Sequence, residues 1–406
     1  MRDRADGRES TALGSLGHMR RVASAAIAAA IVVASLLVLT PFASKSAATV
    51  RQPGALPQLS QMNQLVMVTP SVGYALLETY GATCGIWVAG TTNGGATFHS
   101  PEHVQRVDCN DQNTGSEAIA VDTFGDIFVY GNGLFVSQDG GGSWSRIPMN
   151  GNVLQVVSQG GREWLVETAC GLGTRGPCPL RVAVSSNGGK TWSFTASRPT
   201  GATSSPGVED RTYMLIASDD TVYVFSQPPV INGSTRDQAT WVSPDGGSSW
   251  HVRGVPCRGP VGTDAAIAPS GAVWSVCGGE PGAGQQGKTV DVSYNEGQTW
   301  RATGACSGTG RHEDGALCSG YAQSVVALSG DNAFLAADRG CLMVTRDGGW
   351  RWTCSGGISN GAGYLVQVMF VNLDDGIATG GYGTGFRIYH TSNGGRSWTA
   401  VKPHWS

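Results

Sequence analysis

The sequence predicts an all-β fold, a seven-bladed β-propeller whose blades are four-stranded antiparallel sheets. Three observations predict it: one octapeptide occurs seven times, its copies start at nearly equal intervals, and short β-forming runs flank each copy. Glycine accounts for 60 of the 406 residues and tryptophan for 12. Many glycines together with many tryptophans indicate tight turns around a packed core rather than disorder.

The repeated octapeptide begins with Ser or Thr in every copy and ends with an aromatic residue. The copies read TTNGGATF from Thr91, SQDGGGSW from Ser137, SSNGGKTW from Ser185, SPDGGSSW from Ser243, SYNEGQTW from Ser293, TRDGGWRW from Thr345 and TSNGGRSW from Thr391. Successive copies start 46, 48, 58, 50, 52 and 46 residues apart. A repeat of this period is typical of a propeller or a solenoid.

Three positions of the octapeptide indicate that it is a closed hairpin turn. The third residue offers a short oxygen acceptor that can bind backbone N–H groups further along the turn: Asn93, Asp139, Asn187, Asp245, Asn295, Asp347 and Asn393. The fifth is always Gly, as expected where φ is positive. The eighth is a large apolar anchor: Phe98, Trp144, Trp192, Trp250, Trp300, Trp352 and Trp398. The sixth copy carries Arg351 where Ser or Thr is usual, so we expect a looser turn there.

The flanks of the octapeptides alternate as strands do. In the second unit we expect strands over 118–121, 126–129, 134–137 and 143–147. In the last unit we expect them over 364–371, 376–380, 386–390 and 397–401. Four short strands in about 50 residues make a propeller blade. The sequence therefore predicts seven blades over residues 64–402 that close into a ring, with a tail over 403–406.

The octapeptide resembles the BNR or Asp-box repeat, and the tandem array resembles the sialidase-like and photosystem II assembly-factor-like propellers. The resemblance covers nearly all of the chain after residue 63. It implies a propeller, whereas the function stays open because that superfamily includes glycosidases, sorting receptors and assembly factors.

The N-terminal segment is predicted to direct export. Residues 1–48 hold a basic stretch followed by an uncharged run over 22–39, and 49–63 read as a linker. The run suits either a cleaved signal peptide or a retained signal-anchor helix, and both leave the N-terminus inside. We therefore expect an extracytoplasmic protein, either secreted or held by a single membrane span.

The charge balance argues against nucleic acid as a partner. The formal net charge is −3, and removing the six cationic and three anionic residues before Thr49 leaves 21 cationic against 27 anionic residues. A mildly acidic exported part has no basic face for phosphates.

Ten cysteines, all after the hydrophobic run, read as disulfides in an exported chain. Sequence alone leaves the connectivity open. Pairing nearest neighbours gives Cys84–Cys109, Cys170–Cys178, Cys257–Cys277, Cys306–Cys318 and Cys341–Cys354. None has the paired CxxC spacing of a zinc site, and no metal or cofactor is expected.

The propeller topology places the octapeptides and the longer loops on opposite faces. Each octapeptide joins the third strand of a blade to the fourth, on what we call the turn face. The other face, here the loop-rich face, is expected to carry the segments 101–115, 170–178, 198–211, 228–238, 278–288 and 306–318. Two charged clusters in these segments are candidate ligand-binding residues: Arg311, His312, Glu313 and Asp314, and Glu209, Asp210 and Arg211.

Sialidase activity is the most specific enzymatic function that the resemblance implies, and the sequence departs from the sialidase motif pattern. The family is expected to carry an Arg-Ile-Pro motif in the innermost strand of its first blade, with an acid/base Asp soon after. Here Arg146-Ile147-Pro148 follows the second octapeptide, on an outermost strand. No Arg or Lys lies between Gln52 and Phe98, and no Asp between Thr49 and Val107. No catalytic residue is therefore assigned.

Three candidate functions are compatible with the sequence. The first is a non-catalytic exported propeller that binds a protein or glycan on its loop-rich face. The second is a membrane-anchored assembly or quality-control factor, which resembles the photosystem-associated relatives and would contact the membrane through the N-terminal run. The third is a sialidase-like glycoside hydrolase with a rebuilt site.

Overall fold

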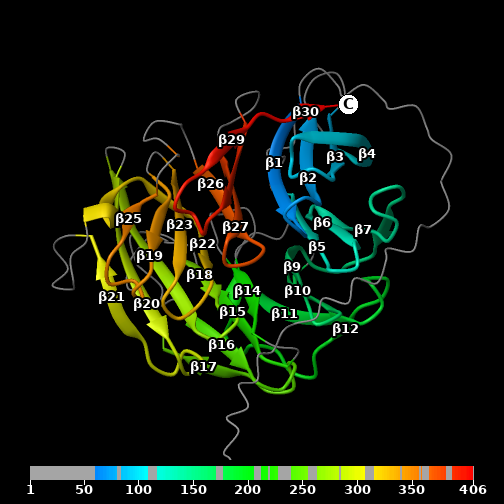
Figure 1. Cartoon of the computed structure of the whole chain (residues 1–406). Coiled ribbons are helices and arrows are strands. Elements are labelled where there is room, and N and C mark those ends of the chain that lie inside the picture. The colour runs from blue at the N-terminus through cyan, green and yellow to red at the C-terminus, as the bar shows by residue number, and fades with distance from the viewer. Residues whose placement is uncertain are drawn as a thin grey trace, which may run out of the picture. The chain divides into compact units, whose positions relative to one another are not determined.

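The computed structural model shows a β-propeller built from the described part of the chain (Figure 1). It describes residues 60–79, 84–107, 117–170, 177–204, 212–217, 220–226, 239–254, 263–282, 285–306, 315–338, 341–355, 358, 365–380 and 386–405. The expected signal or anchor segment over 22–39 lies outside these residues.

Blades I to IV follow one another along the chain as antiparallel sheets. Blade I consists of β1 (Ser60–Met67), β2 (Gly73–Thr79), β3 (Cys84–Thr91) and β4 (Thr97–Val107), and blade II of β5 (Ala118–Val121), β6 (Ile127–Gly131), β7 (Gly133–Ser137) and β8 (Ser145–Ile147). Blade III consists of β9 (Val153–Gln159), β10 (Arg162–Thr168), β11 (Cys178–Ser185) and β12 (Ser193–Phe194), with β13 (Thr203–Ser204) beside β11. Blade IV consists of β14 (Tyr213–Ile216), β15 (Val222–Ser226), β16 (Ala239–Ser243) and β17 (His251–Arg253).

Blades V to VII repeat the same antiparallel order. Blade V consists of β18 (Thr263–Ile267), β19 (Val273–Gly282), β20 (Gln285–Ser293) and β21 (Arg301–Ala305), followed by a short 3-10 helix η1 (Gly315–Cys318). Blade VI consists of β22 (Tyr321–Ala327), β23 (Ala333–Asp338), β24 (Met343–Thr345) and β25 (Thr353–Cys354), and blade VII of β26 (Leu365–Phe370), β27 (Asp375–Gly380), β28 (Arg387–Ser392) and β29 (Thr399–Val401). The predicted fold class, seven four-stranded antiparallel blades, is confirmed.

The first strand of each blade lies nearest the centre of the ring (Figure 1). Contacts between neighbouring blades run mainly through these strands, as in β1 with β5, β5 with β9, and β18 with β22. The fourth strands therefore form the outer edge of the propeller.

Each octapeptide forms the turn between the third and fourth strands of its blade. In the second copy the hydroxyl of Ser137 accepts the N–H of Gly141 and donates to Oδ1 of Asp139, both at 2.8 Å. The same Oδ1 accepts the N–H of Ser143 at 2.9 Å. These three bonds recur in the other six copies, and Arg351 donates its N–H at 2.9 Å like the Ser or Thr it replaces. The sixth turn therefore keeps the full bond pattern, contrary to the expected loosening.

Seven hydrophobic clusters of described residues each lie between two neighbouring blades. Between blades II and III, for example, Phe128 and Leu134 pack with Val153 and Leu165. The last residue of each octapeptide packs into the cluster that its blade shares with the preceding blade: Phe98, Trp144, Trp192, Trp250, Trp300, Trp352 and Trp398. Each turn therefore fastens its blade to the one before it.

The last interface closes the ring between the two ends of the propeller. Ile377 and Ile388 of blade VII share a cluster with Leu65 and Phe98 of blade I. A short strand, β30 (His404–Trp405), pairs in parallel with the start of β4, and Trp405 stacks on Phe98 with 4.8 Å between ring centroids. Closure thus combines apolar packing with one added strand at the outer edge.

The observed strand bounds differ from the expected ones at both ends and in two segments taken as loops. β1 begins at Ser60, inside the expected linker, and β30 lies in the expected tail. The segment 101–115 continues as strand to Val107, and 278–288 is mostly strand in β19 and β20. Backbone pairing explains both, since Arg106 pairs with Gly85 and Pro281 with Gln286.

Candidate functional site

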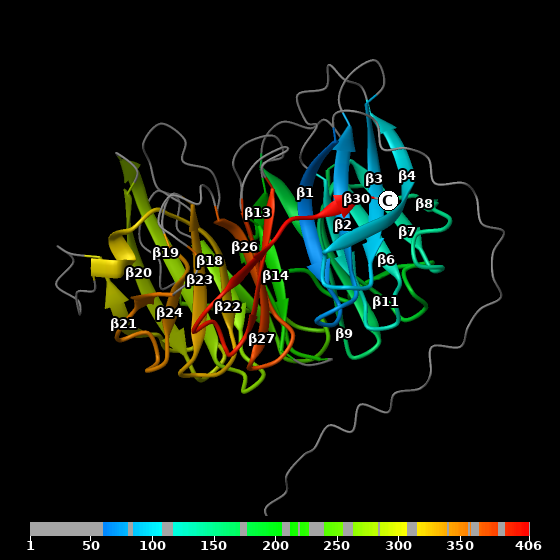
Figure 2. The same cartoon turned by 45° about the horizontal axis from the view of Figure 1, so that its top comes forward.

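The two faces of the ring differ in the chemistry they present. On the turn face, short connections join the first strand to the second and the third to the fourth, and they lie along the lower side of Figure 2. The ends of the second and fourth strands lie on the loop-rich face. The described residues at these strand ends are therefore the candidates for a binding site.

Asp245, the acidic residue of the fourth turn, is unsuited to acid–base chemistry. Hydrogen bonds from the hydroxyl and N–H of Ser249 are the main cause that lowers the pKa of Asp245 to about 2. A carboxylate held this strongly in its ionised form does not donate a proton near neutral pH. The Asp and Asn side chains of the turns act as hydrogen-bond acceptors that close them.

A hollow of about 210 Å³ opens on the loop-rich face of blade I. Its lining comes from the ends of three strands: Thr79 of β2, Cys84, Gly85 and Trp87 of β3, and His103 and Arg106 of β4. Gly85 pairs with Thr79 and Arg106, and Trp87 pairs with His103. Gly85 and Trp87 lie two apart on β3 and so face the same side of the sheet. The register shift between Ile86 and Trp87 lets their partners Arg106 and His103, three apart on β4, lie opposite them on that side.

Two aromatic side chains form one wall of this hollow. Trp87 is half-buried and meets the exposed His103 edge to face, with 4.9 Å between ring centroids and 78° between planes. The indole N–H of Trp87 donates to Oγ1 of Thr79 at 3.3 Å. Burial, and then the neighbouring charge of Arg106, lower the pKa of His103. At neutral pH the imidazole is therefore neutral, and Arg106 carries the positive charge of the hollow.

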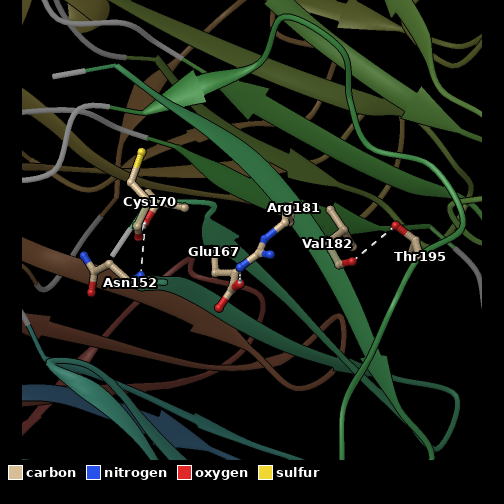
Figure 3. Close-up of polar contacts among 7 residues, drawn as sticks. Asn152, Glu167, Cys170, Arg181, Val182 and Thr195 are labelled. Carbon is tan, nitrogen blue, oxygen red and sulfur yellow. Dashed lines mark hydrogen bonds and ion pairs between the residues drawn. The ribbon is translucent and has the colours of Figure 1, made fainter. Parts of the chain in front are cut away.

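Blade III carries a buried ion pair near the same face. Glu167 of β10 is fully buried and points toward Arg181 of β11, with which it forms an ion pair (Figure 3). Burial raises the pKa of Glu167, and the charge and hydrogen bond of Arg181 oppose that rise. The guanidinium of Arg181 also lies 4.3 Å from the ring centroid of the exposed Phe194. Because the carboxylate of Glu167 is paired with the guanidinium of Arg181, we interpret this ion pair as a structural contact between β10 and β11.

Blade V holds a fully buried lysine that fastens the connection to blade VI. The Nζ of Lys288 lies within hydrogen-bond distance of four backbone carbonyls that its N–H groups share, those of Gln286 at 3.1 Å, Leu317 at 3.0 Å, Ser319 at 2.8 Å and Gly320 at 2.7 Å. Three of these carbonyls belong to η1 and the residues that follow it. Desolvation by burial lowers the pKa of Lys288 to about 7.

Disulfides strengthen the same face. Cys170–Cys178, Cys306–Cys318 and Cys341–Cys354 are bonded, which are three of the five nearest-neighbour pairs. Cys84 and Cys277 are also disulfide-bonded, to partners outside the described residues. Disulfides persist in oxidising compartments, so they indicate an extracytoplasmic environment.

The ligand-binding residues expected from sequence are not placed by the structure. Arg311, His312, Glu313 and Asp314 lie outside the described residues, as do Glu209, Asp210 and Arg211. The structure shows only how the first cluster is framed, by the Cys306–Cys318 disulfide and by Lys288.

The sequence does not predict the hollow of blade I, because the pattern of residues 101–115 indicates a loop. His103 and Arg106 then had no partners on a sheet. The signal present in the sequence was the alternation of Gly85 and Trp87 directly after Cys84, which marks one face of a strand.

Among the residues that the structure describes, no group of three His, Cys, Asp or Glu side chains is placed to hold a metal ion. No helix among those residues is long and apolar enough to cross a membrane.

Known proteins match this chain at the level of structure. No protein-family model and no curated sequence matches it. YCF48 bound to a D1 peptide superposes with a TM-score of 0.52 at 15% identity, covering 83% of this chain and 93% of that chain. YCF48 from Cyanidioschyzon merolae gives 0.51 at 16% identity, covering 83% and 97%. An ulvan lyase of polysaccharide lyase family PL25, bound to -[GlcA(1-4)Rha3S]-, gives 0.51 at 12% identity, covering 84% and 95%.

These similarities define the class of the protein. It is an all-β, seven-bladed propeller, of a fold shared with YCF48 and with a polysaccharide lyase. At 12 to 16% identity the likeness shows the fold alone.

Proposed function

We propose that this protein is an exported, non-catalytic propeller that binds a protein or glycan partner on its loop-rich face. The observation that carries the proposal is the hollow of blade I, where Trp87, His103 and Arg106 open onto that face. The turn face is closed by seven hydrogen-bonded turns and offers less scope for adaptable contacts.

The architecture suits a binding platform. Disulfides and the buried Lys288 hold the ends of several strands on the loop-rich face, so a partner would meet a preorganised surface. Preorganisation reduces the entropy that binding costs. The same fold carries a peptide in one solved relative and a glycan in another, which makes both classes of partner compatible with it.

Binding is favoured over hydrolysis by the charges of the hollow. Its described lining contains one guanidinium and one imidazole of lowered pKa, and no carboxylate. Glycoside hydrolysis by the usual route needs a pair of carboxyl groups on either side of the scissile bond.

Arrays of glycans and of peptides, probed with the labelled full chain, test this function. We expect retention of a defined set of probes that is lost in Arg106→Glu and kept in Arg146→Glu, a matched charge reversal beside the octapeptide turn of blade II. Mass spectrometry of the retained probes should find them intact. Cleaved probes, or loss of retention in the Arg146 variant alone, would contradict the proposal.

A further inference from the structure

A pocket of about 190 Å³ opens on the turn face where blade VII meets blade I. Pro70, in the turn between β1 and β2, borders it on the side of blade I. The other walls come from blade VII, and they include Asp375 and Ile377 of β27, His390 and Ser392 of β28, and Thr399 of β29. The pocket therefore lies at one end of the interface that closes the ring.

The strand register places these blade VII side chains on the same side of their sheet. Asp375 lies opposite Ser392 in the pairing of β27 with β28, and Ile377 lies opposite His390. Thr399 of β29 also lies opposite His390. Residues two apart on a strand point the same way, and Ile377 packs in the hydrophobic cluster shared with blade I. The five side chains therefore form one wall that faces blade I.

This wall is polar at the rim and apolar further in. Ser392 and Thr399 are exposed and Asp375 is half-buried, whereas Ile377 is 3% exposed. Val371, which is half-buried, adds to the apolar part of the lining. A ligand that fits this gradient has one polar end at the rim and an apolar body.

The carboxylate of Asp375 at the rim is not balanced by a cation of the protein. Among the residues that the structure describes, Asp375 forms no ion pair, and its Oδ2 accepts a hydrogen bond from Nδ2 of the exposed Asn372 at 2.9 Å. The hydroxyls of Ser392 and Thr399 lie on the same side of the sheet and add acceptors. A primary ammonium carries three N–H donors and no acceptor, so it matches this set in both charge and hydrogen bonding.

His390 holds this wall against blade I. Its Nε2 donates to the carbonyl oxygen of Gly94 at 2.5 Å, and a Cβ on Gly94 would lie 2.5 Å from Cε1 of the ring. The other six octapeptides are preceded by Gly or Val at this place. An imidazole in direct contact with the next blade thus fixes the pocket before any ligand arrives, which reduces the entropy that binding costs.

We propose that this pocket binds a short primary alkylamine, with its ammonium at the rim beside Asp375 and its alkyl chain against Ile377. At about 30 Å³ for a group the size of water, the pocket holds about six non-hydrogen atoms, the number in pentylamine. A lysine side chain of a partner would enter with its ammonium first and would place the charge beside Ile377, where burial penalises it. The inference goes beyond the proposed function, since the loop-rich face takes no part in it.

Isothermal titration of the full chain with n-pentylamine at pH 7, where an alkylamine is cationic, tests the proposal. We expect saturable binding with a Kd on the order of 1 mM. Asp375→Asn keeps an acceptor for Asn372 and removes the charge, so it should weaken binding at least tenfold. Asp374→Asn is the matched control, because Asp374 is an exposed carboxylate on the same turn that does not line the pocket, and it should stay within twofold of the wild type.

Three further probes of the wild-type protein separate charge, chain and orientation. 1-Pentanol has the same length without the charge, and methylamine has the charge without the chain. Nα-acetyl-lysine methylamide carries its ammonium at the tip of a side chain. Each should bind at least tenfold more weakly than pentylamine.

These comparisons need no variant, so they decide the proposal even if Asp375→Asn unfolds the protein. Absence of saturable pentylamine binding, or equal affinity for 1-pentanol or methylamine, would overturn the proposal. Unchanged pentylamine affinity in a folded Asp375→Asn protein would do the same. Equal or tighter binding of the lysine derivative would replace the free amine with a peptide side chain and overturn the assigned orientation.

Discussion

Phe128 of blade II lies against Gly189 of blade III so closely that a Cβ on the glycine would stand 2.4 Å from the phenylalanine ring. Gly189 is the fifth residue of the third octapeptide and has a φ of 74°. Its left-handed backbone conformation therefore allows the turn to form, and its lack of a side chain leaves room for Phe128 at the interface between blades II and III.

Gly189→Ala should destabilise the protein by about 3 kcal/mol or more, because it adds backbone strain and an overpacked contact. Gly141→Ala is the matched variant, with the same place in its octapeptide and a positive φ, but with its Cβ at 3.7 Å from Ile127. Strain alone should cost it about 1 kcal/mol. Urea unfolding of both variants measures the difference, and equal losses would show that the contact with Phe128 is unimportant.

Glu296 is the single non-glycine residue with a positive φ, 57°, among the residues that the structure describes. It is the fourth residue of the fifth octapeptide, where the other copies have Gly. Glu296→Gly should raise the free energy of unfolding by about 0.5–1 kcal/mol, since it relieves the left-handed conformation at some cost in chain entropy. A thermal melt measures this. Gly140→Ala, at the same place in the second copy, should shift the midpoint in the opposite direction.

Trp352 and Trp192 test how much the aromatic anchors contribute. Each donates its indole N–H to the carbonyl of the fifth residue of its own turn, Gly349 at 3.0 Å and Gly189 at 2.9 Å. Trp352 is buried and Trp192 half-buried. Trp352→Ala should therefore cost about 3–5 kcal/mol and Trp192→Ala about 2 kcal/mol. Chemical unfolding measures both losses. A larger loss for Trp192→Ala than for Trp352→Ala would show that the stabilisation by these residues does not follow their burial.

Lys288 should make stability rise with pH in a range set by its lowered pKa. Below pH 7 both the folded and the unfolded chain hold its proton. Between the folded pKa of about 7 and the ordinary value of 10.5 only the unfolded chain does, so raising the pH favours the folded state. The free energy of unfolding of the wild type, minus that of Lys288→Met, should rise by about 2 kcal/mol from pH 7 to 9. A difference that falls or stays flat would show that burial does not lower this pKa.

The fold was predictable from sequence because its determinants are local and repeated. The hydroxyl, the Asp or Asn and the Gly of each turn are bonded to one another within the octapeptide, and the aromatic residue always occupies the eighth place, so their spacing is visible without a structure. Four predicted strands in each repeat then indicate a propeller blade, and few other folds fit this pattern.

The candidate site was not predictable in the same way because its parts come from three strands. Gly85, Trp87 and Arg106 become neighbours only through a register that contains two shifts, and a register shift leaves no mark in the sequence. The ends of the propeller posed the same problem. Trp405 lies in the predicted tail, and its stacking on Phe98 and the pairing of β30 with β4 join residues more than 300 apart in the sequence.

Hydrogen–deuterium exchange of the full chain, with and without a partner retained on the arrays, tests the central claim most directly. We predict slowed exchange at the strand ends of the loop-rich face, including Gly85 and Arg106, with unchanged exchange at the turn glycines Gly141 and Gly395. Slowed exchange confined to the octapeptide turns would place the partner on the opposite face and contradict the account.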